Sequence, residues 1–324
     1  ACRSATTASW TSSVREVPAV SSPPERTEAA VPAGYIHDLG YRPYRGPRLS
    51  EGPVAWSFFL TGLRNTYGLG RSGRSKVLPM GLLGLMLLPA LILVGVLVQA
   101  RDVLDLDSQI VSYSTYPITT QLLISVFVAA QAPALISRDL RFRTITLYLA
   151  RPMRRPVYVL VRLASLATGT FILIGSPLLL MYVGGLLADL PVGRETTRFL
   201  GGIVGALLLA ALLAGLAALV AALTTRRGMA VAAVTVVLLV SYTVVSAIQG
   251  IALGTGNDTV GEVAGLFSPY TLVNGVQHYL FGVAAATATP PEGAGMGLLY
   301  LLVTVLTVLA SIGALTARYR RVSP

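Results

Sequence analysis

The sequence predicts an all-α membrane protein with six transmembrane helices, an N-terminal interfacial helix and a short helix in a cytoplasmic loop. Three observations support this fold class. Of the 324 residues, 54% are hydrophobic and only 12% are charged, which is about half the charged share of a soluble domain. The apolar residues form runs of about twenty, long enough to cross the hydrocarbon core of a bilayer. Basic residues gather in alternate loops between these runs, as in proteins with a fixed membrane orientation.

The N-terminal part divides into a leader and an amphipathic segment. Residues 1–50 are rich in Ser, Thr, Pro, Ala and turn formers, so we expect a disordered or polar cytoplasmic leader. Residues 51–76 are predicted to form an interfacial helix and an elbow, with Ser50 as N-cap and Pro53 in the first turn. The apolar face of this helix comprises Trp56, Phe59, Leu60, Leu63 and Tyr67. Such a helix lies in the membrane interface or packs on a partner protein.

Residues 77–317 are predicted to form a six-span transmembrane domain, followed by a basic cytoplasmic tail at 318–324. The third span is too long for one straight crossing, so we expect it to be tilted, kinked at Pro177 or extended beyond the bilayer. The six expected spans are Val77–Val98, Ile118–Ser137, Val157–Leu187, Phe199–Leu223, Met229–Leu253 and Met296–Ala317.

The basic residues predict the orientation. The segments before span one, between spans two and three, between four and five, and after six carry 10, 6, 2 and 3 Lys and Arg residues. The alternate loops 99–117, 188–198 and 254–295 carry 1, 2 and 0. We therefore expect the protein in the inner (cell) membrane, with both termini on the cytoplasmic side. Residues 263–283 are apolar, but Pro269 and three polar residues interrupt them, which favours outer-face helices over a seventh span.

The expected spans contain no Asp or Glu, and Arg162 lies near the cytoplasmic end of span three, where it can snorkel to the interface. Span four carries small residues at every fourth position, which allows close approach of another helix. A high background of Ala is the alternative explanation. These helix-packing residues are Gly202, Ala206, Ala210, Ala214 and Ala218.

We expect no catalytic, cofactor-binding or metal-binding residues in this chain. Gly68, Gly70 and Gly73 match a dinucleotide fingerprint, but that motif requires a strand before it and a helix after it in an α/β domain. A flexible elbow is the better interpretation. Cys2 is the only cysteine, and the two His residues are too isolated to suggest a metal site.

The cytoplasmic loop at residues 137–162 is the most informative segment. Ser137 can cap a short helix whose core, Thr144–Ala150, is mostly apolar, and Arg151-Pro152 ends it. An apolar helix in an aqueous loop must be covered, either by lipid headgroups or by a partner protein. The polar or apolar contact residues expected here are Arg138, Asp139, Arg141, Arg143, Leu147, Leu149, Arg151, Arg154 and Arg155.

At these residues the sequence resembles the ABC-2 family of transporter permeases. The matching pieces are Ser137-Arg138-Asp139, the run Thr144–Leu149, Arg151-Pro152 and Arg155. The resemblance implies that this segment is a coupling helix that docks on a separately encoded ATP-binding subunit, which holds ATP and Mg²⁺. It also implies a second permease subunit, identical or related. Family members often have a Glu-rich turn before this helix, whereas the present one is rich in Arg.

The expected function is therefore the permease subunit of an ATP-driven exporter, since the loop signature of importers is absent. The uncharged spans favour a hydrophobic or amphipathic compound, or a lipid, as substrate. No nucleic-acid partner is expected, because the Arg residues lie between spans and face membrane lipids. The alternatives are a membrane scaffold that recruits a cytoplasmic protein, a secondary transporter and an intramembrane enzyme. The last two lack the acidic or catalytic groups that they need.

Overall fold

The computed structural model describes residues 46, 50–70, 73–104, 110–136, 154–224 and 226–320. All regular secondary structure in these ranges is α-helical. The described helices belong to the unit from Arg48 to Pro324, which is separate from residues 1–47. Nearly all of the predicted leader, the loop segment 137–153 and the last four residues of the basic tail lie outside the described residues.

Five helices are long and apolar enough to cross a membrane, so the chain is a multi-pass membrane protein. Each has 28 to 33 residues, or about 42–50 Å at helical rise. Each contains one predicted span and extends it at one or both ends. They are α2 (Gly73–Leu104), α7 (Arg155–Leu187), α8 (Val192–Leu223), α9 (Arg227–Thr255) and α12 (Gly293–Arg320).

The predicted second span corresponds to two shorter helices. The four-residue α3 (Tyr116–Thr119) precedes α4 (Gln121–Leu135), which has 15 residues and is about 22 Å long. The hydroxyls of Thr119 and Thr120 both donate to the carbonyl of Tyr116, at 2.9 and 2.8 Å. These side-chain bonds compete with the helical ladder and mark the break. Helix α4 is thus shorter than the hydrocarbon core, and a sixth crossing remains a prediction.

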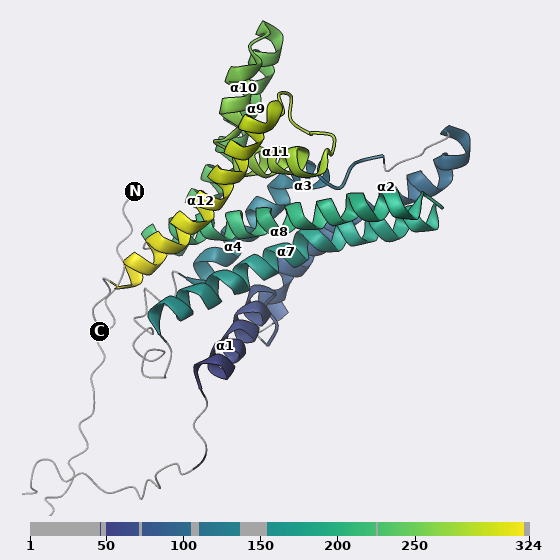
Figure 1. Cartoon of the computed structure of the whole chain (residues 1–324). Helices are drawn as coiled ribbons and strands as arrows, with labels where there is room; N and C mark the ends of the chain where they lie inside the picture. Colours follow the sequence, from purple (N-terminus) through teal and green to yellow (C-terminus); the bar gives the residue numbers. More distant parts are fainter. Residues whose placement is uncertain are drawn as a thin grey trace, which may run out of the picture. The chain divides into compact units, whose positions relative to one another are not determined.

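Helix α4 lies in the core of the bundle. It contacts α7, α8 and α9, and α7 and α8 pack along each other (Figure 1). Ile124, Phe127 and Val128 on α4 are fully buried. By contrast, α2, α9 and α12 carry many exposed Leu, Val and Ile side chains, which is expected for helices that face lipid or another subunit.

Two helices form in the predicted outer segment, α10 (Asp258–Gly265) and α11 (Pro269–Phe281), separated at Ser268. Residues 269–277 of α11 are all buried, against α8 and α12 (Figure 1). Gly275 allows this contact, since a Cβ there would lie 2.4 Å from the ring of Tyr300. The outer-face helices expected at 263–283 thus correspond mainly to α11, which packs inside the bundle.

Helix α1 (Glu51–Thr66) begins after Ser50, as predicted, and packs on α7. The face in contact is centred on the small residues Gly62 and Thr66, both buried. Trp56, which belongs to the predicted apolar face, remains 62% exposed. The elbow that follows turns through Gly68 and Gly70, both with positive φ, between two helices. No strand precedes it, so the fingerprint lacks the context of a nucleotide site.

Candidate functional site

Two of the nine residues predicted to contact a partner, Arg154 and Arg155, are described. Arg154 directly precedes α7, and Arg155 is its first residue. They lie at the end of the bundle that the basic residues assign to the cytoplasm, which we call the inner end. The other seven lie outside the described residues: Arg138, Asp139, Arg141, Arg143, Leu147, Leu149 and Arg151.

Arg154 and Arg155 connect the start of α7 to two other helices. The backbone N–H of Arg154 donates to Glu51 Oε1 at 2.9 Å, and its Nε lies 3.8 Å from Glu51 Oε2. Arg155 Nη1 donates to the carbonyl of Arg320 at 3.0 Å. Because the Arg154 side chain is 83% exposed, its ion pair contributes little to stability. The contacts nevertheless connect the start of α7 to α1 and to the last turn of α12.

Further along, α1 and α7 interlock through small residues. A Cβ at Gly62 would lie 2.4 Å from Ser165 Oγ, and a Cβ at Gly169 would lie 2.7 Å from Thr66 Cγ2. The Tyr67 hydroxyl donates to the carbonyl of Gly169 at 2.7 Å. Burial raises the pKa of Tyr67, so this phenol stays neutral. Helix α1 is thus fitted to α7 by shape as well as by hydrogen bonds.

Arg162 lies within this contact. Its side chain is buried, with 6% exposure, and its guanidinium carbon lies 4.3 Å from the ring centre of Phe58 on α1 and 5.6 Å from that of Tyr158. The predicted snorkelling to the interface is therefore wrong. The charge is placed against aromatic faces, which attract a cation, because α1 covers this part of α7.

The predicted packing residues of span four all lie on the buried side of α8. Ala206, Ala210, Ala214 and Ala218 have at most 1% exposure, and Gly202 is buried with its missing Cβ 2.6 Å from that of Tyr113. Gly205 is closer still, since a Cβ there would overlap the amide of Gln277 on α11. These contacts place the segment before α3 and the helix α11 directly against α8.

At the opposite, outer end, α8 carries a buried polar cluster that sequence reasoning missed. Glu195 is fully buried and accepts hydrogen bonds from the Tyr113 hydroxyl at 3.0 Å and from Arg198 Nη1 at 3.3 Å. The prediction had assigned 188–198 to a loop, whereas α8 begins at Val192. The i, i+3 spacing of acid and base, typical of a helix start, was the available signal.

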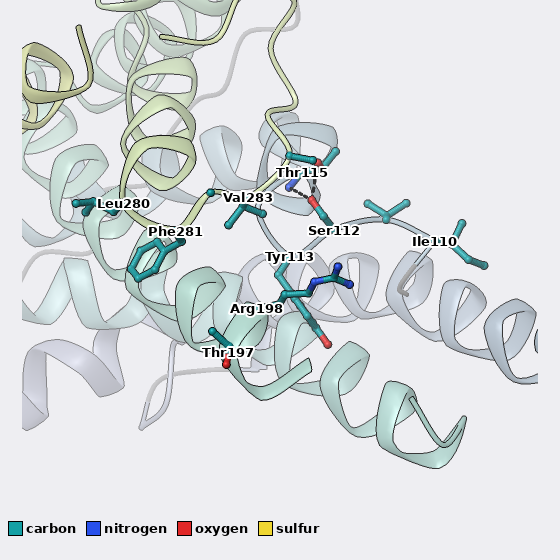
Figure 2. Close-up of a pocket in the computed structure, with 12 residues that line it drawn as sticks. Ile110, Ser112, Tyr113, Thr115, Thr197, Arg198, Leu280, Phe281 and Val283 are labelled. Atoms are coloured by element: carbon teal, nitrogen blue, oxygen red, sulfur yellow. Dashed lines mark hydrogen bonds between the residues drawn. The ribbon is translucent and has the colours of Figure 1, made fainter. Parts of the chain in front are cut away.

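Next to this cluster lies a pocket of about 710 Å³, which we call the outer pocket. Figure 2 shows Leu280, Phe281 and Val283 on its α11 side, Ile110 on the opposite side, and Tyr113 and Arg198 between them. The described residues that line it are Ile110, Val111, Ser112, Tyr113, Thr115, Thr197, Arg198, Leu280, Phe281, Gly282, Val283 and Ala284.

Buried side-chain amides connect the segments around the outer pocket. Gln277 on α11 donates to the carbonyl of Gly201 on α8 at 3.2 Å. Asn274 donates to the carbonyl of Ser114 at 3.5 Å and accepts the N–H of Ala286 at 3.0 Å. Each of these bonds joins residues distant in sequence and shielded from water, so the outer end is stabilised by polar contacts that are costly to break.

A second buried carboxylate, Glu262 on α10, has a structural role. Its Oε1 accepts the N–H of Glu292 at 2.9 Å, and Gln249 on α9 donates to the carbonyl of Gly261 at 3.2 Å. Within the described residues, no group of three or more His, Cys, Asp or Glu side chains could hold a metal ion. These groups therefore connect α9, α10 and the start of α12.

No protein-family model matches the sequence, and no curated protein is significantly similar to it. The class that fold and site define is a multi-pass α-helical membrane protein. Its inner end flanks an Arg-rich segment, and its outer end contains a pocket beside an ion pair between buried Glu195 and partly exposed Arg198.

Proposed function

We propose that the chain is the permease subunit of an ATP-driven exporter of the ABC-2 kind, with six spans and both termini in the cytoplasm. The segment 137–153 contains its coupling helix, Arg141–Ala150, which docks on a separate ATPase subunit that binds ATP and Mg²⁺. A second permease subunit, identical or related, completes the transport pathway. The substrate is a hydrophobic or amphipathic compound, or a lipid.

One observation carries the proposal. The segment that resembles the coupling loop of ABC-2 permeases joins α4 to α7, and both helices belong to the buried core of the bundle. A displacement of this segment is therefore applied directly to core helices. A scaffold protein that only recruits a partner through this loop would not need the loop to be joined to core helices.

The contacts of α7 support a route for the motion. A rigid α7 carries α1 with it, because Gly62 and Gly169 interlock with Ser165 and Thr66. Its first residue is bonded to the end of α12 through Arg155. Docking of the coupling helix therefore moves α1, α7 and the inner end of α12 together, which is a rigid-body change of the kind used by transporters.

The exposed helices can contact either the second permease subunit or lipid. Helices α2, α9 and α12 present rows of exposed aliphatic side chains, such as Val236, Val240 and Val244 on α9. A surface of this kind suits lipid and helix alike. Crosslinking of the chain in the membrane would identify which of these helices contacts the second subunit.

The buried Glu195 bears on the rival secondary transporter. The expected span Phe199–Leu223 contains no acidic residue, but helix α8 begins before it, and the first turn of α8 contains Glu195. Its partner Arg198 is the last charged residue before Arg226, so the pair lies at the helix end and not at the midplane. Ion-coupled carriers place their carboxylates near the midplane, which favours the exporter.

The proposal is tested by replacing Leu147 and Leu149 with Asp. Two carboxylates in the apolar core of the coupling helix should abolish docking, and with it the transport-linked stimulation of ATP hydrolysis in the assembled complex. Membrane insertion and expression should remain unchanged. Leu104→Asp with Leu106→Asp, a pair of the same spacing in the predicted outer loop, is the matched control and should retain coupling.

Normal coupling in the Leu147/Leu149 variant would refute the assignment. So would a purified chain that binds no ATPase. Loss of ATPase binding, with full insertion, supports it.

A further inference from the structure

We propose that the outer pocket binds the anionic headgroup of a membrane lipid, with Arg198 as the cation that contacts the phosphate. This proposal does not depend on the exporter assignment. It concerns the opposite end of the bundle from the 137–153 segment, since α7 and α8 are antiparallel and α8 begins where α7 ends.

The first argument is the composition of the pocket. Among the described residues that line it, Arg198 is the one with a charge. Ile110, Leu280, Phe281 and Val283 provide apolar walls, and the hydroxyls of Ser112 and Thr115 bond to each other at 2.8 Å. One cation surrounded by apolar side chains is complementary to a molecule that joins an anion to a hydrocarbon chain.

The second argument is how Arg198 is held. Glu195 is fully buried, whereas the Arg198 side chain is 41% exposed. The carboxylate holds one terminal nitrogen of the guanidinium, Nη1, and the side chain lines the pocket (Figure 2). The hydrogen bond to Glu195 uses one of five N–H groups, and Arg can offer two of the others to a phosphate in parallel. Tyr113 holds the second oxygen of Glu195, which keeps the carboxylate in place.

The third argument is depth in the membrane. No charged residue lies between Arg198 and Arg226, and this uncharged stretch is long enough to cross the hydrocarbon core. Arg198 is therefore at the boundary of the core, where lipid phosphates lie. The pocket is open at that level to a lipid whose chains follow the apolar walls. A free phosphate ion would leave those walls without a partner, so the lipid is the better occupant.

The test is photocrosslinking of the purified full chain, in neutral detergent, with phosphatidylglycerol that carries a diazirine in its acyl chain near the headgroup. Peptide mapping reads the pocket itself, so lipid bound at the Arg-rich inner end does not interfere. We expect crosslinks within 110–115 or 280–284. Arg198→Gln should reduce them about tenfold or more, the effect of losing a charge-assisted hydrogen bond.

Arg194→Gln is the matched control. It removes the same charge from the same helix end, but Arg194 does not line the pocket, so its crosslinks should stay within about twofold of the wild type. Ile110→Glu is the second variant. Ile110 is exposed, so this change is compatible with folding, and its carboxylate should repel the lipid phosphate.

Three results would overturn the proposal. The first is equal crosslinking of phosphatidylcholine analogues, because the site would then have no preference for an anionic lipid. The second is competition by an equal concentration of glycerol 3-phosphate, which would indicate a site for a soluble anion. The third is wild-type crosslinking in Ile110→Glu together with equal yields for Arg198→Gln and Arg194→Gln. If Arg198→Gln lowers the melting temperature, its loss of crosslinking could come from unfolding, and the crosslinking of Ile110→Glu then decides whether the proposal holds.

Discussion

The two ends of the α7–α8 pair are held together by different kinds of contact. At the outer end, side chains bond across the bundle in buried surroundings: Tyr113 to Glu195, and Gln277 to the carbonyl of Gly201. At the inner end, the polar contacts of Glu51 and Arg154 are exposed, and the fit of α1 on α7 depends on the space above glycines. The outer end is thus held by several buried polar contacts between elements, and the inner end mainly by shape, with one buried hydrogen bond from Tyr67 to Gly169.

This difference indicates which end of the bundle can move. If the outer end opened, buried donors and acceptors would lose their partners in a low-dielectric environment, so opening it is costly. An exposed ion pair exchanges its partner for water at little cost. The contact of Glu51 with Arg154 lies within the α1–α7 pair and does not attach the pair to the other helices. The pair can therefore shift at the inner end while the outer end keeps its arrangement, as the proposed function requires.

The largest expected effect comes from removing the buried carboxylate at the outer end. Glu195→Ala leaves the buried Tyr113 hydroxyl and the partly exposed Arg198 without this acceptor, and removing a charged partner from a buried hydrogen bond costs about 2–3 kcal/mol of unfolding free energy. Denaturant or thermal unfolding of the purified chain in detergent measures it. Glu51→Ala, the matched change at the inner end, should cost no more than about 1 kcal/mol.

Equal losses for Glu195→Ala and Glu51→Ala would contradict the comparison. Glu195→Gln sharpens it, because the amide oxygen can still accept the Tyr113 hydroxyl. We expect this variant to recover part of the lost stability.

The second effect concerns shape at the inner end. Gly169→Leu places a side chain where a Cβ alone would lie 2.7 Å from Thr66, so α1 must move away from α7 at a cost of about 2 kcal/mol. Gly84→Leu on α2 is the control, since a Cβ there meets nothing within 4 Å. A cysteine pair across α1 and α7 should crosslink in the control and not in Gly169→Leu. Crosslinking of both variants at the wild-type rate would show that the interlock is not tight.

Much of the fold could be predicted, because a lipid solvent demands long apolar helices. Five of the six predicted spans correspond to long helices, and the break before α11 lies at Ser268-Pro269. Hydropathy locates the apolar part of a helix but does not show at which residue the helix begins or ends. Helix α8 begins seven residues before the predicted Phe199, because Arg194 and Glu195 read as loop residues when their burial is unknown.

The outer pocket could not be predicted for a related reason. Its lining comes from three segments, 110–115, 197–198 and 280–284, and nothing in their spacing shows that they meet. The burial of α11 was missed because its polar residues, Asn274 and Gln277, suggested an interfacial helix. They are in fact satisfied by backbone carbonyls of Ser114 and Gly201. The predicted contact segment 137–153 lies outside the described residues, so its role remains a prediction.

The smallest expected effect is on the Tyr67 hydroxyl at the inner end, and it depends on pH. Tyr67→Phe loses one hydrogen bond to Gly169, worth about 1 kcal/mol at pH 8. Burial raises the pKa of Tyr67 in the folded chain, whereas the unfolded phenol titrates near its ordinary value of about 10. Above that pH the unfolded state binds fewer protons, so the contribution of Tyr67 to stability falls as pH rises.

The advantage of the wild type over Tyr67→Phe should therefore be full below pH 10 and decline above it. Melting temperatures of the two proteins from pH 8 to pH 11 measure this difference, and their comparison cancels the other buried tyrosines. A constant difference over this range would mean that the Tyr67 hydroxyl reaches water. In that case α1 does not cover α7 as the structure has it, and the inner end is looser than its glycine contacts require.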